Sequence, residues 1–249
     1  MSASPSFVLT RTPLELKFRT ATLASREWRA PGYVRIRVQG EQLRGFTSLG
    51  SDDHMRLFFP EGVPASVDEM REGPSREYTP LAWGEDWLDI EFAIHGDEGI
   101  AAPWAATAPL GSTIGVGGPR GSMVIEGTPG GWLLVGDETA IPAITRFAAL
   151  AGDAPTIIAV EVPSATHEVP MDAEVQWLHR GDAPAGSAIE TFLAGLGDPV
   201  AADPFCFIAA EQSVVKPGRA LLARWGVSPE RAVVKGYWKR GEAEYHAPH

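Results

Sequence analysis

A change of hydrophobic rhythm near residues 126–131 constrains this chain more than any other feature. Before it, apolar and charged residues alternate with a period of two, most clearly in residues 33–38 and 87–94, as expected for strands that bury one face. After it, short continuous apolar runs such as residues 132–135 alternate with helical stretches. Such runs are typical of strands that helices cover on both faces. The sequence therefore predicts two domains of different architecture.

Residues 1–128 are predicted to form an all-β domain. Further strands are expected at residues 55–59 and 112–116, with turn residues between them, and only residues 104–108 favour a helix. Several short strands joined by turns favour a closed or nearly closed antiparallel barrel.

Residues 129–249 are predicted to form a parallel α/β domain, because strand and helix patterns alternate along this half. Its expected strands are residues 132–135, 156–160, 174–178, 205–208 and 232–234, and its expected helices are residues 140–150, 188–194 and 218–225. The glycine- and proline-rich segment 126–131 is the expected linker.

The charge of the chain excludes one class of partner. A net charge of −11 from 21 basic and 32 acidic residues argues against nonspecific nucleic-acid binding, which depends on neutralising phosphates. Residues 211–240 differ from the rest, with seven Lys and Arg against two acidic residues, a local charge of +5. We therefore expect one basic region on an acidic protein.

Cysteine content and hydropathy limit the redox chemistry and the cellular location expected for the chain. Cys206 is the single cysteine, so the chain cannot form an internal disulfide or supply the four thiolates of an iron–sulfur cluster. Redox chemistry would need a bound cofactor, and no metal site is expected. No apolar run reaches the roughly 18 residues of a membrane span, and the N-terminus lacks a signal-peptide pattern. We expect a cytoplasmic monomer without a membrane partner.

Three segments carry candidate binding chemistry. In residues 76–79, a period of two puts Arg76 and Tyr78 on one strand face, so a guanidinium suited to phosphate lies beside an aromatic ring. Residues 95–104 place a glycine loop before a short helix, whose free N–H groups suit a diphosphate. Residues 135–144 form a strand-to-helix turn, in which acidic residues also favour the helix dipole. Each segment alone is also compatible with an ordinary strand or turn.

Taken in order, six segments resemble the siderophore-interacting protein family, a branch of the ferredoxin-reductase-like flavoproteins. They are residues 53–60 (DHMRLFFP), 76–79 (REYT), 95–104 (HGDEGIAAPW), 118–121 (GPRG), 136–143 (GDETAIPA) and 236–241 (GYWKRG). The resemblance spans roughly residues 14–241. It implies a six-stranded antiparallel Greek-key barrel that binds FAD, followed by an α/β domain that receives NADPH or NADH, with a ferric siderophore as oxidant.

The resemblance also implies roles for individual residues. Arg76 would hold the FAD phosphates, Tyr78 would pack on the isoalloxazine, and Thr79 would approach flavin N5 as the one residue with direct influence on hydride transfer. The adenine and diphosphate end would be lined by His95, Gly99, Ile100, Ala101 and Ala102, with Trp104 behind. The remaining cofactor-binding candidates are Asp137, Glu138 and Thr139 at the nicotinamide side, together with Trp238.

The basic region near the C-terminus is the candidate substrate site. Lys235, Lys239 and Arg240 flank the family-like Gly-Tyr-Trp segment, and many ferric siderophores are anionic, so a local positive field would attract them. The same cations are equally compatible with solvated helix and strand faces. The flavin suits the chemistry, because ferric iron accepts one electron whereas a nicotinamide gives two.

Departures from the family pattern leave alternatives open. Leu81 stands where the family often has Arg, the usual Gly-Pro-Ala-Ser loop is residues 99–102 (GIAA), and Ala210 adds a methyl group that would narrow the nicotinamide slot. Glu161 follows Gly136 by about 25 residues, where an acid can bind a ribose hydroxyl and favour NADH, while Arg180 keeps NADPH possible. The other interpretations are a ferredoxin-fed reductase, a siderophore-binding flavoprotein without turnover, and a general flavoprotein oxidoreductase.

Overall fold

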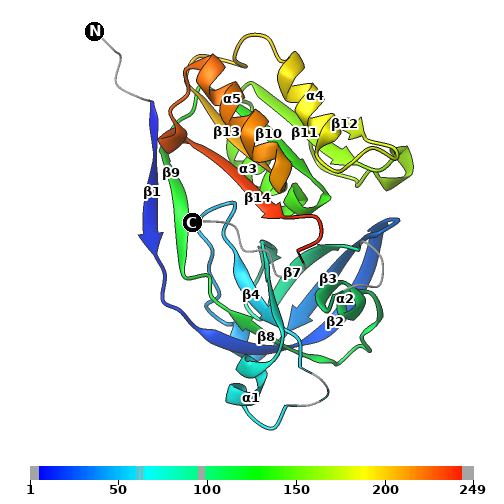
Figure 1. Cartoon of the computed structure of the whole chain (residues 1–249). Helices are drawn as coiled ribbons and strands as arrows, with labels where there is room; N and C mark the ends of the chain where they lie inside the picture. The colour runs from blue at the N-terminus through cyan, green and yellow to red at the C-terminus, as the bar shows by residue number, and fades with distance from the viewer. Residues whose placement is uncertain (1–5, 61, 63, 95–98, 243–249) are drawn as a thin grey trace. The chain divides into compact units, whose positions relative to one another are not determined.

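The chain forms two compact units in a computed structural model that describes residues 6–60, 62, 64–94 and 99–242. One unit comprises residues 11–124, and the other comprises residues 125–242 together with residues 6–10 of the described N-terminal part (Figure 1). We call them the β unit and the α/β unit. Strands β1 (Phe7–Pro13) and β9 (Gly121–Gly127) form a separate two-stranded sheet, and the division between the units falls within both strands.

The β unit is built on one seven-stranded sheet with the order β5-β4-β8-β2-β3-β7-β6. Every strand pair in this sheet is antiparallel, and the ribbon is strongly curled (Figure 1). The strands are β2 (Phe18–Ala30), β3 (Tyr33–Gln39), β4 (Met55–Phe58), β5 (Ser75–Tyr78), β6 (Pro80–Trp83), β7 (Trp87–Ala93) and β8 (Thr113–Gly117).

The two ends of this sheet are consecutive in the chain. Strands β5 and β6 lie at opposite ends of the hydrogen-bonded order, yet only Thr79 separates them in sequence. Pro80 begins β6, and a residue without an N–H cannot continue a regular ladder. One extended segment therefore pairs with β4 through its first half and with β7 through its second half.

The inner face of the curled sheet holds the core of the β unit. Alternating apolar residues of β3 and β7, among them Ile36, Ile90 and Phe92, are fully buried there. Helix α2 (Ala101–Thr107) adds Ala101 and Ala105 to the same cluster. Helix α1 (Val67–Glu72) is capped by the Ser66 hydroxyl, which accepts from the Glu69 N–H at 3.1 Å.

The α/β unit contains a five-stranded parallel sheet with the order β12-β11-β10-β13-β14. The strands are β10 (Gly131–Asp137), β11 (Thr156–Val162), β12 (Gln176–His179), β13 (Pro204–Glu211) and β14 (Ala232–Trp238). The order reverses between β10 and β13, and the carboxyl ends of strands at such a switch point form a crevice where ligands bind in open α/β sheets.

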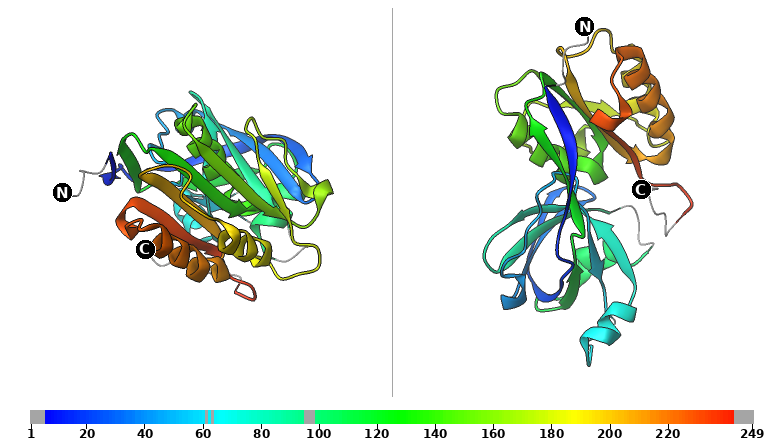
Figure 2. Two further views of the ribbon diagram at one scale, coloured as in Figure 1. Left: turned by 90° about the horizontal axis from the view of Figure 1, so that it is seen from above. Right: turned by 90° about the vertical axis from the view of Figure 1, so that its left-hand side faces the viewer.

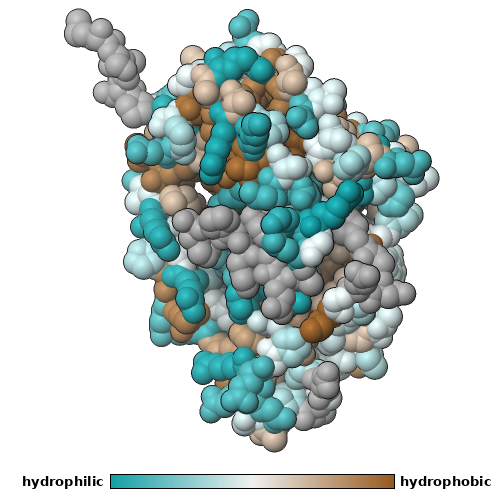
Figure 3. Space-filling view, in the orientation of Figure 1, coloured by the Kyte–Doolittle hydropathy of each residue, from teal (hydrophilic) through white to brown (hydrophobic). Residues whose placement is uncertain are grey.

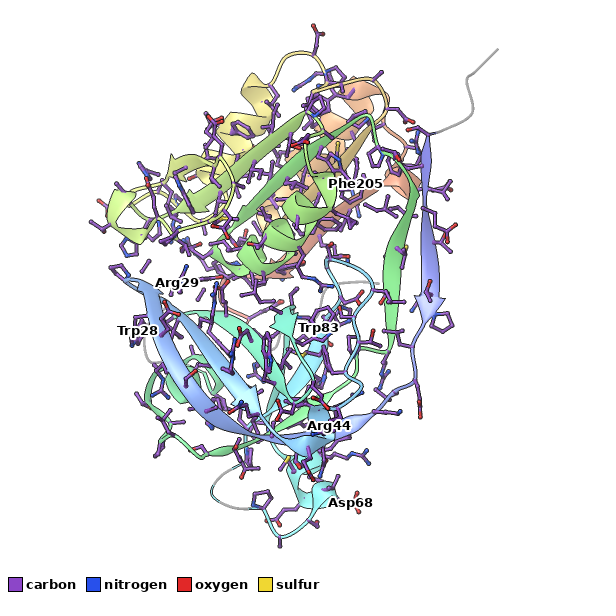
Figure 4. The ribbon with its side chains drawn as sticks, turned by 180° about the vertical axis from the view of Figure 1, so that it is seen from behind. Trp28, Arg29, Arg44, Asp68, Trp83 and Phe205 are labelled. Atoms are coloured by element: carbon purple, nitrogen blue, oxygen red, sulfur yellow. The ribbon has the colours of Figure 1, made fainter. Side chains whose placement is uncertain are left out.

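Helices cover both faces of this parallel sheet. Helices α4 (Ser187–Gly195) and α5 (Val215–Trp225) lie side by side over one face (Figure 2), where Leu133, Ile208 and Leu221 share one buried cluster. Helix α3 (Ile141–Ala151) packs Phe147 against Phe205 and Phe207 on the opposite face, with ring centroids 5.0 Å apart in both pairs. Phe205 is labelled in Figure 4.

The predicted fold class is confirmed at the level of an antiparallel β part followed by a parallel α/β part. The predicted helix at residues 104–108 begins earlier, at Ala101, and the remaining predicted helices and strands match their structural counterparts to within a few residues. Strands β1, β2, β6 and β9 and helix α1 were not predicted. The 13 residues of β2 include buried Arg19 and two Thr, so its apolar alternation is weak.

Candidate functional site

The β unit carries Arg76 and Tyr78 on one strand, in the arrangement that their spacing predicts. The register of β5 against β4 pairs Arg76 with Leu57 and Tyr78 with Met55, so both side chains share the face of those two core residues. Glu77 lies on the opposite face, where it pairs with Arg56 at 3.0 Å. A guanidinium and an aromatic ring thus stand two residues apart on the same side of the sheet.

Tyr78 is half-buried and held by an aromatic neighbour. Its ring centroid lies 4.2 Å from that of Phe92 on β7. Burial raises the pKa of the Tyr78 phenol well above its usual value, against the opposing effect of the Arg76 charge, so the ring stays neutral at physiological pH. The packing fixes the ring plane while leaving part of the side chain exposed.

Thr79 occupies the single position between β5 and β6, and it is almost fully buried. The change of strand partner at this residue fixes its position relative to Tyr78. Leu81, one of the departures from the family pattern, follows on β6 and is half-buried. Trp83, labelled in Figure 4, lies at the end of β6. It packs edge-on against Phe46, with ring centroids 5.5 Å apart.

The predicted diphosphate loop leads into helix α2, although His95 lies outside the described residues. Gly99 adopts a φ of +83°, which favours glycine, and a Cβ built there meets no atom within 4 Å among the described residues. Ile100 is the N-cap of α2 and makes no side-chain capping bond to the described part of the chain. Ala101 and Ala102 form the first turn, where N–H groups have no helical partner.

Two further residues hold helix α2 in place. Trp104 packs edge-on against Phe59 with ring centroids 5.4 Å apart. Arg26 on β2 donates its Nη2 to the carbonyl oxygen of Ala108 at 2.6 Å and its Nε to that of Ala105 at 2.5 Å. No sequence pattern identifies Arg26 as a contact of this helix, because its partners lie about 80 residues away.

In the α/β unit, the Asp137 carboxylate accepts several hydrogen bonds at the switch point of the sheet. It ends β10 and is 1% exposed, so its carboxylate needs internal partners. Oδ1 accepts from the backbone N–H and the hydroxyl of Thr139. Oδ2 accepts from the backbone N–H of Glu211 at 3.1 Å and from Nε1 of Trp238 at 2.7 Å. One carboxylate thus joins the carboxyl ends of β10, β13 and β14, and it brings together three of the predicted residues.

Glu138, the next residue, is buried beside a cation that lies about 40 residues further along the chain. Its Oε1 accepts from Nη1 of Arg180 at 3.4 Å. Burial, and then the negative charge of Asp137, raise the pKa of Glu138 to about 7, while the hydrogen bonds of the carboxyl group and the Arg180 charge act in the opposite direction. Glu138 is therefore a weaker acid than an exposed glutamate.

The expectation that Glu161 binds a ribose hydroxyl is wrong. Glu161 is fully buried, and its two carboxylate oxygens accept from the backbone N–H groups of Gly186, Ala188 and Ile189 at 2.7–3.2 Å. These groups form the start of helix α4, so Glu161 satisfies helix donors that lack partners. Its acidity consequently gives no reason to favour NADH.

The expected effect of Ala210 is also not what the structure shows. Ala210 is fully buried on β13 and belongs to the hydrophobic cluster beneath α4 and α5. Its methyl group therefore fills the core of the sheet face rather than an open slot.

The basic region of residues 211–240 is divided among several roles. Arg224 donates to the carbonyl oxygens of Leu193 and Leu196, and Arg231 forms an ion pair with Asp203. Of the three substrate candidates, Lys235 is half-buried within β14, Lys239 pairs with Glu242 at 2.6 Å, and Arg240 is exposed, with its backbone N–H bound to Glu211. Hydrophilic side chains also follow the exposed side of α5 (Figure 3).

Other proteins share this combination of an antiparallel β part followed by a parallel α/β part. The ferredoxin reductase of carbazole 1,9a-dioxygenase has a similar fold, with a TM-score of 0.64 at 13% identity, over 89% of this chain and 69% of that one. The crystal structure of a siderophore utilization protein from T. fusca is more similar to this chain. It has a TM-score of 0.84 and 30% identity, over 96% of this chain and 98% of that one.

Sequence comparison identifies the family. The model of the siderophore-interacting FAD-binding domain matches residues 22–123, and that of the siderophore-interacting protein matches residues 130–241. The NADPH-dependent ferric-chelate reductase of Escherichia coli is 34% identical over 245 residues, covering 90% of this chain and 94% of that protein. The ferric vibriobactin reductase ViuB of Vibrio cholerae is 28% identical, covering 86% and 87%. The chain belongs to the siderophore-interacting protein family.

Among the described residues, every helix is too short or too polar to cross a lipid bilayer.

Proposed function

We propose that this protein is an FAD-dependent ferric-siderophore reductase that takes electrons from NADPH or NADH. The observation that carries the proposal is the 34% identity, over nearly the whole chain, to an enzyme named as an NADPH-dependent ferric-chelate reductase. The match of residues 22–123 to an FAD-binding domain supports the cofactor. We place the reaction in the cytoplasm, where pyridine nucleotides are available, and we propose that the protein acts as a monomer.

We assign FAD to the β unit and the nucleotide to the α/β unit. We infer that the β unit is a six-stranded Greek-key barrel. Support for this comes from β5 and β6, which are one segment interrupted at Thr79 and pair with β4 and with β7 respectively. The α/β unit supplies a parallel sheet with a switch point, which is the usual place for a dinucleotide.

The residues of the β unit fit FAD. Arg76 offers a guanidinium for a phosphate, and Tyr78 offers a neutral ring that Phe92 holds in place. Gly99 and the start of α2, which receive no side-chain cap from the described residues, suit a diphosphate, with Ile100, Ala101 and Ala102 contributing backbone donors and Trp104 packing behind. Thr79, next to Tyr78, is the residue we assign to the reactive edge of the flavin, and His95 stays assigned to the adenine end from the family pattern alone.

The residues of the α/β unit position the nucleotide. Asp137 is fixed by four hydrogen bonds, so it holds Thr139 and Trp238 at the carboxyl ends of β10 and β14. We assign these three residues, with Glu138, to the nicotinamide side of the site. Lys235, Lys239 and Arg240 are assigned to an anionic ferric siderophore, since a net charge of −11 would otherwise repel it.

The bound flavin would supply the electron chemistry by accepting a hydride and passing single electrons to iron. The protein then needs no side chain as an acid, base or nucleophile. Iron is released because hard oxygen ligands hold Fe(III) far better than Fe(II). The tasks of this chain are therefore to bind the flavin, to orient it and to attract the substrate.

A single anaerobic experiment tests the proposal. The purified protein, loaded with FAD, is titrated with NADPH and separately with NADH while flavin absorbance is recorded. A ferric catecholate siderophore is then added with an Fe(II)-trapping dye. Bleaching by a nucleotide, followed by stoichiometric dye colour, is the expected result. Very slow bleaching by both nucleotides with fast re-oxidation by the siderophore would instead support the ferredoxin-fed reductase. Absence of both steps would support a siderophore-binding flavoprotein without turnover.

A further inference from the structure

A small cavity lies beside the edge strand of the parallel sheet. Its volume is about 260 Å³, and the residues that line it all belong to the segment 168–177, which leads into β12. In the described sheet β12 is the last strand, and β11 separates it from β10 and the switch point. Sites for drug-sized ligands and cofactors occupy roughly 300–1,000 Å³. This cavity therefore suits one small chemical group rather than a dinucleotide.

One wall of the cavity is the indole of Trp177. The residue is half-buried on β12, where it is opposite Val160 of β11. Within the described part of the chain, no aromatic ring or cation packs against this indole, and its Nε1 makes no hydrogen bond. The ring is therefore available to a bound molecule.

The other walls are apolar except for one carboxylate. Met171, Ala173 and Val175 line the cavity together with Trp177, and this spacing of two residues turns one side of the segment toward it. Glu168 is the one charged side chain among the described residues that line the cavity. The cavity thus combines an aromatic ring, aliphatic surface and a single negative charge.

Glu168 is held at one carboxylate oxygen and open at the other. Its Oε1 lies 2.8 Å from Nε2 of His179, the last residue of β12, and 37% of its side chain is exposed. Its Oε2 receives no hydrogen bond from the residues that the structure describes. The bond to His179 fixes the carboxylate, and Oε2 remains able to accept from a ligand.

The charge of the segment selects the sign of the ligand. Residues 163–179 contain Glu168, Asp172 and Glu174 but no Lys or Arg, and Asp172 and Glu174 are exposed. Both follow lining residues directly, about 4 Å along the chain, which is well within the Debye length of about 8 Å at physiological salt. The next basic residue, Arg180, is paired with Glu138. This cavity repels phosphates and attracts cations.

We propose that the cavity binds an organic cation, a guanidinium or ammonium group on a short apolar stem. The cation lies against Trp177 and donates to Oε2 of Glu168, while the stem contacts Met171 and Val175. Indole attracts cations more strongly than the other aromatic rings, and the bond to the carboxylate is charge-assisted. The proposal goes beyond the reductase function, because the cavity shares no residue with the flavin, nucleotide or siderophore assignments.

The experiment compares two ligands that differ mainly in charge. The n-butylguanidinium ion carries the cation, and n-butylurea has nearly the same shape without it. Saturation-transfer NMR that observes the ligand gives both dissociation constants with the full-length, FAD-loaded protein. We expect butylguanidinium to bind about tenfold more tightly than butylurea, and we expect this preference to shrink as salt is raised.

Variants locate the bound cation. Trp177→Leu keeps an apolar wall but removes the ring, and it should weaken butylguanidinium binding about fivefold. Glu168→Gln keeps the shape of the side chain but removes its charge, and it should weaken binding about fivefold to tenfold. Glu190→Gln removes an exposed acid of α4 and is the matched control, with affinity within about twofold of the parent. Glu168→Gln keeps the test decisive if Trp177→Leu does not fold.

Three results would overturn the proposal: no binding of butylguanidinium by the parent, equal affinity for the two ligands, or parent-like affinity in Glu168→Gln. A capped pentapeptide with one arginine between glycines distinguishes the sources of the cation. Binding tighter than that of butylguanidinium assigns the cavity to a basic protein segment, and equal or weaker binding assigns it to a small free cation. Glu168→Gln should keep the parent rate of flavin reduction by NADPH, so a failure of the reductase function is seen separately.

Discussion

The indole N–H of Trp238 donates to Oδ2 of Asp137 across 2.7 Å, and this bond joins the last residue of β14 to the last residue of β10. The two strands are not neighbours in the sheet, since β13 lies between them. The backbone N–H of Glu211 at the end of β13 donates to the same carboxylate oxygen. A single buried acid therefore holds three strand ends together at the edge where we place the nucleotide.

Trp238→Phe should lower the free energy of unfolding by about 1.5–3 kcal/mol, because it removes a hydrogen bond to a buried charge. Trp225→Phe is the matched control, since Nε1 of Trp225 donates to the neutral carbonyl oxygen of Gly197 at 2.8 Å. Its expected cost is about 0.5–1.5 kcal/mol. Urea unfolding followed by circular dichroism measures both. Equal losses in the two variants would contradict the role of the Asp137 charge.

Glu138→Gln should change how stability depends on pH. The pKa of Glu138 is raised from 4.5 to about 7 in the folded protein, so the folded state binds more protons and loses stability as pH rises through that interval. At 1.36 kcal/mol per unit this penalty is about 3 kcal/mol at most. Stability curves of parent and variant should separate between about pH 4.5 and 7 and run parallel above pH 8. Curves that stay parallel throughout would show that Glu138 does not titrate in this range.

Gly136→Ala should destabilise the α/β unit by about 1–3 kcal/mol, because there is no room for a methyl group. A Cβ at Gly136 would lie 2.4 Å from Cβ of Ala140 and 2.6 Å from the carbonyl oxygen of Ala209. Gly197→Ala serves as control, as its Cβ meets no described atom within 4 Å, and it should change stability by less than about 0.5 kcal/mol. Thermal or urea unfolding separates the two, and a neutral Gly136→Ala would mean that β10 and η2 (Glu138–Ala140) shift apart easily.

Arg76→Ala should weaken FAD binding about tenfold to a hundredfold, as expected for the loss of a charge-assisted contact of about 1.5–3 kcal/mol. Arg56→Ala removes a guanidinium from the opposite face of the same strand pair. It should leave flavin affinity within about twofold of the parent, since a partly exposed ion pair contributes little. Flavin fluorescence during reconstitution measures both constants. Tight flavin binding by a folded Arg76→Ala protein would refute the assignment.

The double variant Lys235→Ala/Lys239→Ala should bind an anionic ferric siderophore more weakly and respond less to salt. Steering by exposed charges fades as the Debye length shrinks from about 10 Å at 0.1 M to about 3 Å at 1 M salt. Pre-reduced protein is mixed with siderophore at several salt concentrations, so that the nucleotide step does not contribute. Lys216→Ala/Arg219→Ala on α5 is the control with the same change in charge. Identical salt curves for the parent and the Lys235/Lys239 variant would show that these lysines are ordinary solvated side chains without a role in docking.

Local patterns in the sequence determined the division into an antiparallel and a parallel part, as well as the approximate spans of most helices and strands. They also placed Arg76 and Tyr78 on one strand face, because the alternation of side chains depends only on neighbouring residues. The closure of one segment onto both ends of the curled sheet at Thr79 was not visible, since it depends on strands β4 and β7 that are distant in sequence.

Only the tertiary structure decided what the acidic residues of the α/β unit do. The sequence placed Glu161 correctly near a strand end, but its partners at Gly186, Ala188 and Ile189 lie 25–28 residues further along the chain. Arg180 and Glu138 are 42 residues apart. A buried carboxylate takes whichever donors the packing brings to it, because leaving it without partners costs several kcal/mol. Its role is therefore set by the fold around it rather than by its position in a motif.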